Sequence, residues 1–250
     1  MTNGAILQQA RCALILARKD LRIYYAKGPV IIFGILFPLF LFLAFAIGRH
    51  LTLDFTIPAL LGMILFFTST SISPVVAPWE AQSRTLERLM CCPVRLETII
   101  LGDILASFGF GLAISLVPLI LGLSLGLSVS HPFVLALALI LAAFCFSSLG
   151  SVFSIPPTNM PSTVQMVSGA VKLPIIFISG IFIPLDELPL WGQVLSYFSP
   201  LTYFVDLVRA SLQGQGHLPP LVDLLALLAF AALFLIVALR FHRRTMPQRL

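Results

Sequence analysis

Residues 80–94 have the sequence EAQSRTLERLMCCPV and form a long, densely charged segment between two strongly apolar stretches. The flanking stretches, residues 55–79 and 104–130, contain no Asp, Glu, Lys or Arg. Each is longer than the roughly 18 apolar residues that indicate a transmembrane helix. A polar segment between two membrane spans must face water. We therefore predict that residues 80–94 are the place where a soluble partner acts on the membrane domain.

The composition of the chain is typical of a polytopic membrane protein. Hydrophobic residues make up 59% of the 250 residues and charged residues 10%, whereas a soluble domain carries about 25% charge. The net charge of +5 does not indicate a nucleic-acid partner, because basic residues of membrane proteins gather in cytoplasmic loops. The four cysteines show neither a disulfide framework nor a metal-binding spacing. We therefore expect reduced thiols and no metal site.

The apolar stretches predict an all-α fold in one transmembrane domain covering residues 1–250. Most of the breaks between them contain proline, glycine or charged residues. Glycine spaced by four residues within the third stretch would let helices approach closely. The six predicted spans cover residues 28–48, 55–79, 104–130, 132–155, 162–184 and 221–239.

The first 27 residues predict an amphipathic helix in the membrane interface. Apolar residues recur every three or four positions from Leu7 to Tyr24, which places them on one helical face. Arg18, Lys19 and Arg22 lie beside that face and would point towards lipid phosphates. We expect no cleavable signal peptide, since the first long apolar stretch begins late and is too long.

The distribution of lysine and arginine predicts that both termini lie in the cytoplasm. With six spans, only Arg49 and Arg209 fall in outer loops, and Lys172 lies within a span. All the other basic residues then fall in inner segments. This orientation puts residues 80–97 in the cytoplasm and residues 185–220 outside. Prolines and aromatic residues in the outer segment favour two short helices that re-enter the membrane.

Several functions are disfavoured by motifs that the sequence lacks. It contains no G-x-x-x-x-G-K-[ST] phosphate loop, no H-E-x-x-H and no G-x-S-x-G, so we expect no catalytic residues. Ion-coupled carriers usually hold acidic residues near the membrane midplane. Here every carboxylate falls in a loop or at the end of a predicted span. A secondary carrier and a membrane scaffold or receptor remain as alternatives to a transporter driven by a separate ATPase.

Three stretches resemble the type-2 ATP-binding-cassette (ABC) export permeases, the relatives of drug, lipid and polysaccharide exporters. Residues 85–89, TLERL, follow Glu80 and precede Pro93-Val94, similar to the family's G-T-L-E-x-L and x-P-V signature. Residues 179–184, SGIFIP, with Leu188-Pro189 are similar to its S-G-x-x-x-P…L-P pattern. Residues 199–203, SPLTY, are similar to N-P-L-T-Y. The order of the three motifs and the spans extends the resemblance over nearly the whole chain.

The chain departs from the family pattern at two positions. Arg84 stands where the family usually has glycine, and Ser199 stands where it often has asparagine. We expect neither departure to change the fold. Arg84 would alter the charge that faces a partner.

The resemblance implies roles for particular residues. Residues 80–97 would contain a coupling helix seated in the ATPase subunit, with Leu86, Leu89 and Met90 as buried contacts and Glu80, Glu87 and Arg88 as charges. Residues 1–27 would be the connecting helix, which touches the same subunit. The coupling residues implied are Glu80, Arg84, Thr85, Leu86, Glu87, Arg88, Leu89, Met90, Pro93 and Val94. The residues implied for the re-entrant outer gate are Pro184, Pro189, Trp191, Pro200, Tyr203, Asp206 and Arg209.

Lys172 has two interpretations from sequence. It could line the substrate pathway or the dimer interface, or the fifth helix could start later and leave it near the cytoplasmic boundary. A lysine within a span costs about 2.5–3.5 kcal/mol on insertion scales. Phe177 and Phe182 are further pathway candidates.

The resemblance also implies partners and location. The chain would be a non-catalytic subunit in the cell membrane that pairs with a second permease copy and with cytoplasmic ABC ATPase subunits. ATP and magnesium would bind those ATPases and not this chain. The expected activity is export of an amphipathic or lipid-linked substrate by alternating access.

Overall fold

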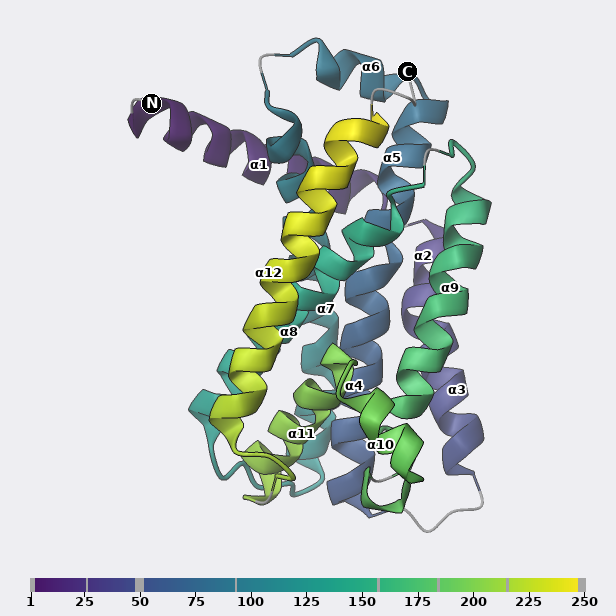
Figure 1. Ribbon diagram of the computed structural model, residues 1–250, viewed down its shortest axis with the longest axis vertical. Coiled ribbons are helices and arrows are strands. Elements are labelled where there is room, and N and C mark those ends of the chain that lie inside the picture. The colour runs from purple at the N-terminus through teal and green to yellow at the C-terminus, as the bar shows by residue number, and fades with distance from the viewer. Residues whose placement is uncertain are drawn as a thin grey trace.

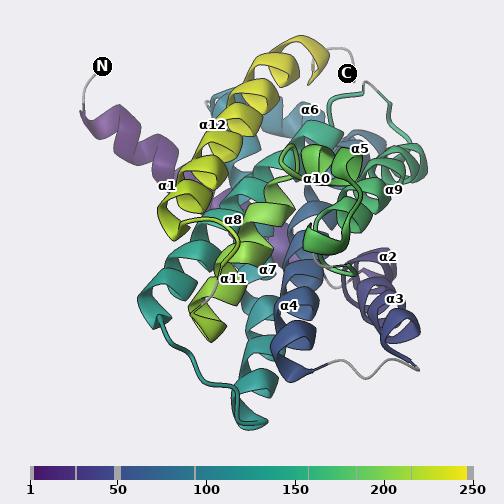
Figure 2. The ribbon, with the colours of Figure 1, turned by 60° about the horizontal axis from the view of Figure 1, so that its bottom comes forward.

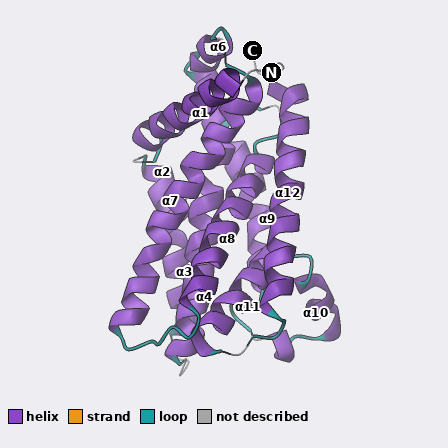
Figure 3. Cartoon of the chain, turned by 90° about the vertical axis from the view of Figure 1, so that its left-hand side faces the viewer, coloured by secondary structure: helices purple, strands orange, loops and turns teal. Residues whose placement is uncertain are grey.

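The computed structural model describes residues 3–25, 27–47, 52–92, 94–156, 158–183, 185–214 and 216–246, and all regular elements within these ranges are helical (Figures 1 and 3). Apolar helices satisfy their own backbone hydrogen bonds, which is the requirement for a segment in lipid. The helices are α1 (Asn3–Ile23), α2 (Gly28–Ile31), η1 (Ile32–Leu36), α3 (Phe37–Ala46), α4 (Leu53–Ser71), α5 (Ser73–Gln82), α6 (Thr85–Met90), α7 (Leu96–Ser124), α8 (Pro132–Phe153), α9 (Pro161–Ile178), η2 (Leu185–Glu187), α10 (Leu190–Ser196), α11 (Pro200–Gln213) and α12 (Pro220–Thr245).

Five helical segments are long and apolar enough to cross a membrane. They agree with the predicted all-α membrane fold, although their bounds differ from those expected. The start of α7 and the end of α12 lie beyond the predicted stretches, because a helix can continue into water after its apolar part ends. By contrast, α7, α8 and α9 end before the predicted stretches do. The five segments are Asp54–Gln82, Leu96–Ser124, Pro132–Phe153, Pro161–Ile178 and Pro220–Thr245.

The first apolar stretch is a succession of short helices. A π-helical turn, η1, separates α2 from α3, and the amide of Phe37 donates to the carbonyl of Ile32 five residues earlier. Pro38 follows at once and lacks an amide donor, which is a common cause of such irregular turns. Among the described residues no single helix here has the length of the other five. The sixth crossing therefore stays a prediction.

The segment that contains α4 and α5 forms the centre of the bundle. In its most apolar part 94% of the residues are buried within the chain, compared with 22% in α9 and in α12. α4 packs against α7, α8 and α11. Phe66 of α4 and Phe204 of α11 both contact Phe146 of α8 edge-on. By contrast, many large apolar side chains of α7, α9 and α12 are exposed, as expected of surfaces that face lipid or another subunit.

The helices α1, α6 and the last turns of α12 gather at one end of the bundle, which we call the α6 end (Figures 1 and 3). Helices α10 and α11 lie at the opposite end, the α11 end, which Figure 2 brings forward. α1 crosses α7 at Gly102, where a Cβ would lie 2.8 Å from that of Leu16. The absence of a side chain at Gly102 thus allows α1 to lie directly on α7.

Candidate functional site

The charged segment of residues 80–94 is divided between α5, α6 and the turn before α7, and does not form one helix. Its first residues complete α5, residues 85–90 form α6, and α7 begins at Leu96. Arg84 makes the reversal between α5 and α6 in a left-handed conformation, with φ 54° and ψ 24°. The hydroxyl of Ser83 bonds to the carbonyl of Trp79, and that of Thr85 donates to the carbonyl of Glu80 at 3.2 Å. These bonds hold α6 across the end of α5.

One face of α6 is packed against its own chain. The side chain of Leu86 is fully buried, in a cluster with Ala77 of α5 and Met246 after α12. Met90 lies at the margin of this cluster, and Leu89 is half-buried. Leu86 is the first of the predicted apolar contacts with a partner, and in this chain its side chain is enclosed by the chain itself.

The other face of α6 is exposed and charged. Arg84, Glu87 and Arg88 are all exposed, so their charges are available to a second protein. Val94 is half-buried, and Pro93 lies outside the described residues. We call Arg84, Glu87 and Arg88 the α6 charged face.

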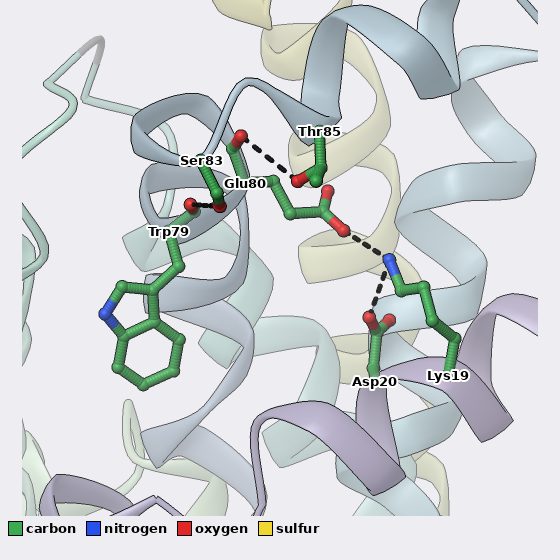
Figure 4. Close-up of polar contacts among 6 residues, drawn as sticks. All are labelled: Lys19, Asp20, Trp79, Glu80, Ser83 and Thr85. Atoms are coloured by element: carbon green, nitrogen blue, oxygen red, sulfur yellow. Dashed lines mark hydrogen bonds and ion pairs between the residues drawn. The ribbon is translucent and has the colours of Figure 1, made fainter.

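Glu80 points away from this face and into the bundle. Its residue is 1% exposed, and its carboxylate pairs with the ammonium group of Lys19 from α1 (Figure 4). The same ammonium lies 2.9 Å from the Asp20 carboxylate, whose side chain is fully buried. Glu80 is one of the charges predicted to face a partner, and in this chain its carboxylate instead holds α1 against α5.

The pKa of Lys19 shows how strongly this pair is held. Burial alone would lower the pKa of Lys19, but the carboxylates of Asp20 and Glu80 outweigh it and raise the pKa above its usual range. Lys19 therefore stays charged at every physiological pH. Its contribution to stability is fully present below the usual pKa of lysine, about 10.4, and would be lost only as the pH rises through the raised value.

Aromatic side chains cover one side of the junction between α1 and α5. The rings of Tyr24 and Trp79 stack with centroids 5.5 Å apart, and the Lys27 ammonium lies 4.3 Å from the Trp79 ring centroid. Burial, followed by the nearby Glu80 carboxylate, raises the pKa of Tyr24 to about 12, so the phenol stays protonated. Arg18 and Arg22, the other predicted connecting-helix cations, are exposed.

Sequence reasoning missed two buried acids at this junction. Both lie outside the predicted spans, Asp20 in the amphipathic helix of residues 1–27 and Asp103 just before the third apolar stretch. α7 begins earlier than expected, so Asp103 lies inside a helix and is 8% exposed. The only available signal was that Asp20 directly follows Lys19 on α1.

The left-handed conformation of Arg84 leads to a prediction about stability. A non-glycine residue in this conformation costs about 1–2 kcal/mol. Replacement by glycine removes this cost, but part of the gain is lost because glycine has a higher conformational entropy in the unfolded state. We expect Arg84→Gly to raise the free energy of unfolding by about 0.5–1 kcal/mol. Arg88→Gly, inside α6, should lower it by about 1 kcal/mol. Thermal unfolding of the purified chain measures both changes, and a loss of stability in Arg84→Gly would contradict the strain.

A groove runs along the side of the bundle between the first apolar segment and α9. Two adjoining cavities of about 270 and 450 Å³ share Phe33, Ser162 and Gln165 in their lining. The walls are otherwise almost wholly apolar, and Lys172 lies in the lining of the larger cavity.

The structure places Lys172 well inside α9. α9 begins at Pro161, so the interpretation that the helix starts later and leaves Lys172 near its end is wrong. Lys172 is 2% exposed, and its amine donates to the carbonyl of Thr70 at 2.9 Å. The two aromatic pathway candidates differ in exposure: Phe177 is 51% exposed, whereas Phe182 is buried. Their ring centroids lie 5.2 Å apart.

At the α11 end, α10 and α11 form two short helices in the region predicted to re-enter the membrane. Pro189 precedes α10 and Pro200 begins α11, where a missing amide donor matters least. Trp191 is 67% exposed. The hydroxyl of Tyr203 donates to the carbonyl of Tyr197 at 2.8 Å, which ties the two helices together.

Two charged side chains of α11 hold neighbouring segments. The Asp206 carboxylate accepts hydrogen bonds from the amides of His217 and Leu218, both at 2.8 Å. Arg209 donates to the carbonyl of Gly180 at 2.8 Å. Pro184, the remaining gate candidate, lies outside the described residues. Asp206 and Arg209 thus brace α11 against the turns that precede α12 and follow α9.

The described part of the chain holds no group of three or more His, Cys, Asp or Glu side chains placed to bind a metal ion. What the α6 end does offer is an exposed charged face on the short helix α6, and a buried ion pair that joins the preceding helix, α5, to α1. This arrangement is suited to transmitting force between a bound protein and the bundle.

Comparison with known proteins places the chain among transporters. The family model described as ABC-2 type transporter matches residues 12–212. "Nodulation protein J" of Rhizobium leguminosarum bv. trifolii is 32% identical over 151 residues, covering 56% of this chain and 52% of that protein. "Inner membrane transport permease YadH" of Escherichia coli K12 is 26% identical over 155 residues, covering 62% of this chain and 60% of that protein.

A third relative is "Probable multidrug ABC transporter permease YbhR" of Escherichia coli K12. It is 24% identical over 160 residues, which cover 62% of this chain and 42% of that protein. The matched part is thus less than two thirds of each relative's length.

Proposed function

Because this chain belongs to the ABC-2 type transporter family, whose members are membrane subunits of ABC transporters, we propose that it is the translocation subunit of an ATP-driven exporter. The proposed substrate is amphipathic, either drug-like or lipid-linked, and it leaves the cytoplasm or the inner leaflet. The multi-pass helical bundle and the similarity to permeases support this proposal. ATP and magnesium would bind the partner ATPase, and this chain would supply no catalytic residue.

The observation that carries the proposal is the α6 charged face. Arg84, Glu87 and Arg88 are exposed on a helix whose opposite face is anchored by Leu86. A helix that is fixed on one side and charged on the other can receive a displacement from a docked protein and pass it to α5. We therefore propose that a cytoplasmic ABC ATPase subunit docks on this face, and that α1 lies close to the same subunit.

This role requires the α6 end to face the cytoplasm. The basic side chains at that end support the orientation, because positive residues favour the cytoplasmic side. Arg243 near the end of α12 pairs with Glu97 at the start of α7 at 2.5 Å, while Arg11 and Arg18 of α1 are exposed. Both termini would then be cytoplasmic, in the cell membrane.

We propose the groove beside α9 as part of the substrate path. Its apolar walls, including Phe33 and Phe37, suit an acyl or aromatic group, and it opens on the side of the bundle where α9 exposes Met166 and Phe177. A second permease copy packed against this side would enclose the groove.

A charge reversal on α6 tests the proposed function. We expect Glu87→Arg to reduce at least 10-fold both the ATPase activity of the assembled complex and the export that this activity drives. The substitution places a third positive charge on the α6 charged face, which must complement the charges of the ATPase. Since Glu87 is exposed, the thermal stability of the permease should stay unchanged. Glu187→Arg makes the same substitution at the exposed Glu187 of the α11 end and should leave both activities intact.

The alternatives predict different results. Transport by the purified chain with a proton gradient and no ATPase would show a secondary carrier and overturn the proposal. A membrane scaffold or receptor would bind no ATPase in pull-down experiments with the wild-type chain. Loss of ATPase binding in Glu87→Arg but not in Glu187→Arg would support the exporter.

A further inference from the structure

The chain breaks in the middle of its most buried segment. α4 ends at Ser71, α5 begins at Ser73, and Ile72 between them has φ −102° and ψ −48°. The sequence before the break is rich in hydroxyl side chains. Thr68, Thr70 and Ser71 donate to the carbonyls four residues earlier, at 2.5–2.6 Å. Such bonds compete with the regular ladder and bend helices.

Pro74 removes the donor that would continue the helix through the break. In an α-helix the amide of residue 74 would donate to the carbonyl of Thr70, but proline has no amide hydrogen. The amide of Val75 donates instead to the carbonyl of Ile72 at 2.9 Å, which starts the new helix. The Thr70 carbonyl is therefore left without its helical partner, on a residue that is fully buried.

Lys172 supplies the missing donor from another helix. Its amine lies 2.9 Å from the Thr70 carbonyl and is enclosed by Phe67 and Phe153, with ring centroids 6.0 and 5.9 Å away. The lysine is 2% exposed, and no carboxylate is paired with it in the described part of the chain. A backbone carbonyl, and not an acid, is thus its partner.

Other contacts fix the opposite side of the same break. The hydroxyl of Ser73 lies 2.5 Å from that of Ser107 in α7, which accepts a hydrogen bond from Tyr25 at 2.9 Å. Gly150 of α8 packs so closely that a Cβ there would lie 3.1 Å from the Thr70 Cα. The break is therefore clamped between α7 and α8 on one side and by Lys172 of α9 on the other.

We propose that Lys172 is an interhelical latch that replaces the amide donor missing at Pro74 and so fixes the α4–α5 break and the position of α6. The latch makes α9, which borders the groove, a direct support of the break where α5 begins, and α5 leads to the α6 charged face. A change in α9 would then reach α6 through this hydrogen bond and along α5. The assignment of α6 as the ATPase contact rests on the proposed function, but the latch itself does not.

The test measures the position of α6 in the full chain without ATPase. Spin labels are placed on Cys92, at the end of α6, and on Phe133→Cys at the exposed start of α8, in a chain with Cys12, Cys91 and Cys145 replaced by serine. Pulsed electron resonance in nanodiscs gives the distance distribution. We expect Lys172→Met to shift or broaden it by several ångströms, and Lys172→Arg, which keeps a donor, to preserve it.

A second substitution makes the test specific for the missing amide. Pro74→Ala restores the donor to the Thr70 carbonyl, so the Pro74→Ala, Lys172→Met double variant should regain a narrow distribution. A merely structural role for Lys172, such as filling space, would not be relieved by a change at Pro74. An unchanged distribution in Lys172→Met, or no recovery in the double variant, would overturn the latch.

The same variants decide the outcome if Lys172→Met fails to fold. Recovery of folded protein on adding Pro74→Ala would support the latch, and no recovery would overturn it. The wild-type and double-variant distances need no partner or nucleotide. A failure of the ATPase docking experiment would therefore refute the proposed function and leave the latch in place.

Discussion

Glu80→Lys is expected to lower the free energy of unfolding by about 3–5 kcal/mol, the range for removing one partner of a buried ion pair. The variant would place a second ammonium beside Lys19 in a site where Glu80 is 1% exposed. Asp20, at 2.9 Å from the Lys19 ammonium, would be left to neutralise both cations. We expect α1 to detach from α5 and export to fall to background, measured by thermal unfolding and by transport in vesicles.

Exchanging the charges of Lys19 and Glu80 distinguishes the energy of the ion pair from the effect of the surrounding residues. Lys19→Glu combined with Glu80→Lys restores one attraction and should recover more than half of the lost free energy. Recovery should be incomplete, because a glutamate at position 19 would lie beside Asp20. Glu187→Lys at the exposed Glu187 is the matched control and should cost under about 0.5 kcal/mol. A cost below about 1 kcal/mol for Glu80→Lys would contradict a buried ion pair.

Leu86→Asp is expected to release α6 from the bundle while the other helices stay folded. Burying a carboxylate in the cluster of Ala77 and Met246 would cost more free energy than the packing of α6 against this cluster provides. Undocking α6 costs only the burial of Leu86, about 1.5–3 kcal/mol, and is the cheaper response. Residues 85–90 should therefore lose their hydrogen-exchange protection, and ATP-driven export should stop.

Two further measurements check this result. Leu86→Met keeps the volume and the apolar character and should cost less than about 1.5 kcal/mol, with export retained. Exchange protection in α8 should be the same in both variants, because α8 lies in a separate core cluster. Retained protection of residues 85–90 in Leu86→Asp would show that Leu86 does not anchor α6.

The class of fold was within reach of sequence because it depends on local composition. An apolar stretch of sufficient length must form a helix in lipid whatever its neighbours are. This is why the centre of α8 and of α12 could be placed closely. The ends could not, since α7 and α12 extend as helices beyond their apolar parts. The two short helices α10 and α11 follow from the prolines that start them.

The candidate site was predictable as a location but not as a set of contacts. The charge of residues 80–97 indicated a polar segment, and exposed Glu87 and Arg88 agree with that. Periodicity could not show which face of a six-residue helix, α6, turns inward. Leu86 and Glu80 were both assigned outward and both point into the chain, because their partners, Met246 and Lys19, are far away in sequence.

The sequence alone determined that the chain is a helical membrane protein with a charged segment between apolar helices, and its motifs indicated the ABC-2 family. These properties follow from hydrophobicity and local residue order. Only the tertiary structure showed that Glu80 of residues 80–94 binds Lys19, and that Lys172 replaces the amide missing at Pro74. The reason is physical: a buried charge or an unpaired carbonyl is satisfied by whichever group the packing brings near, and distance along the chain does not limit that choice.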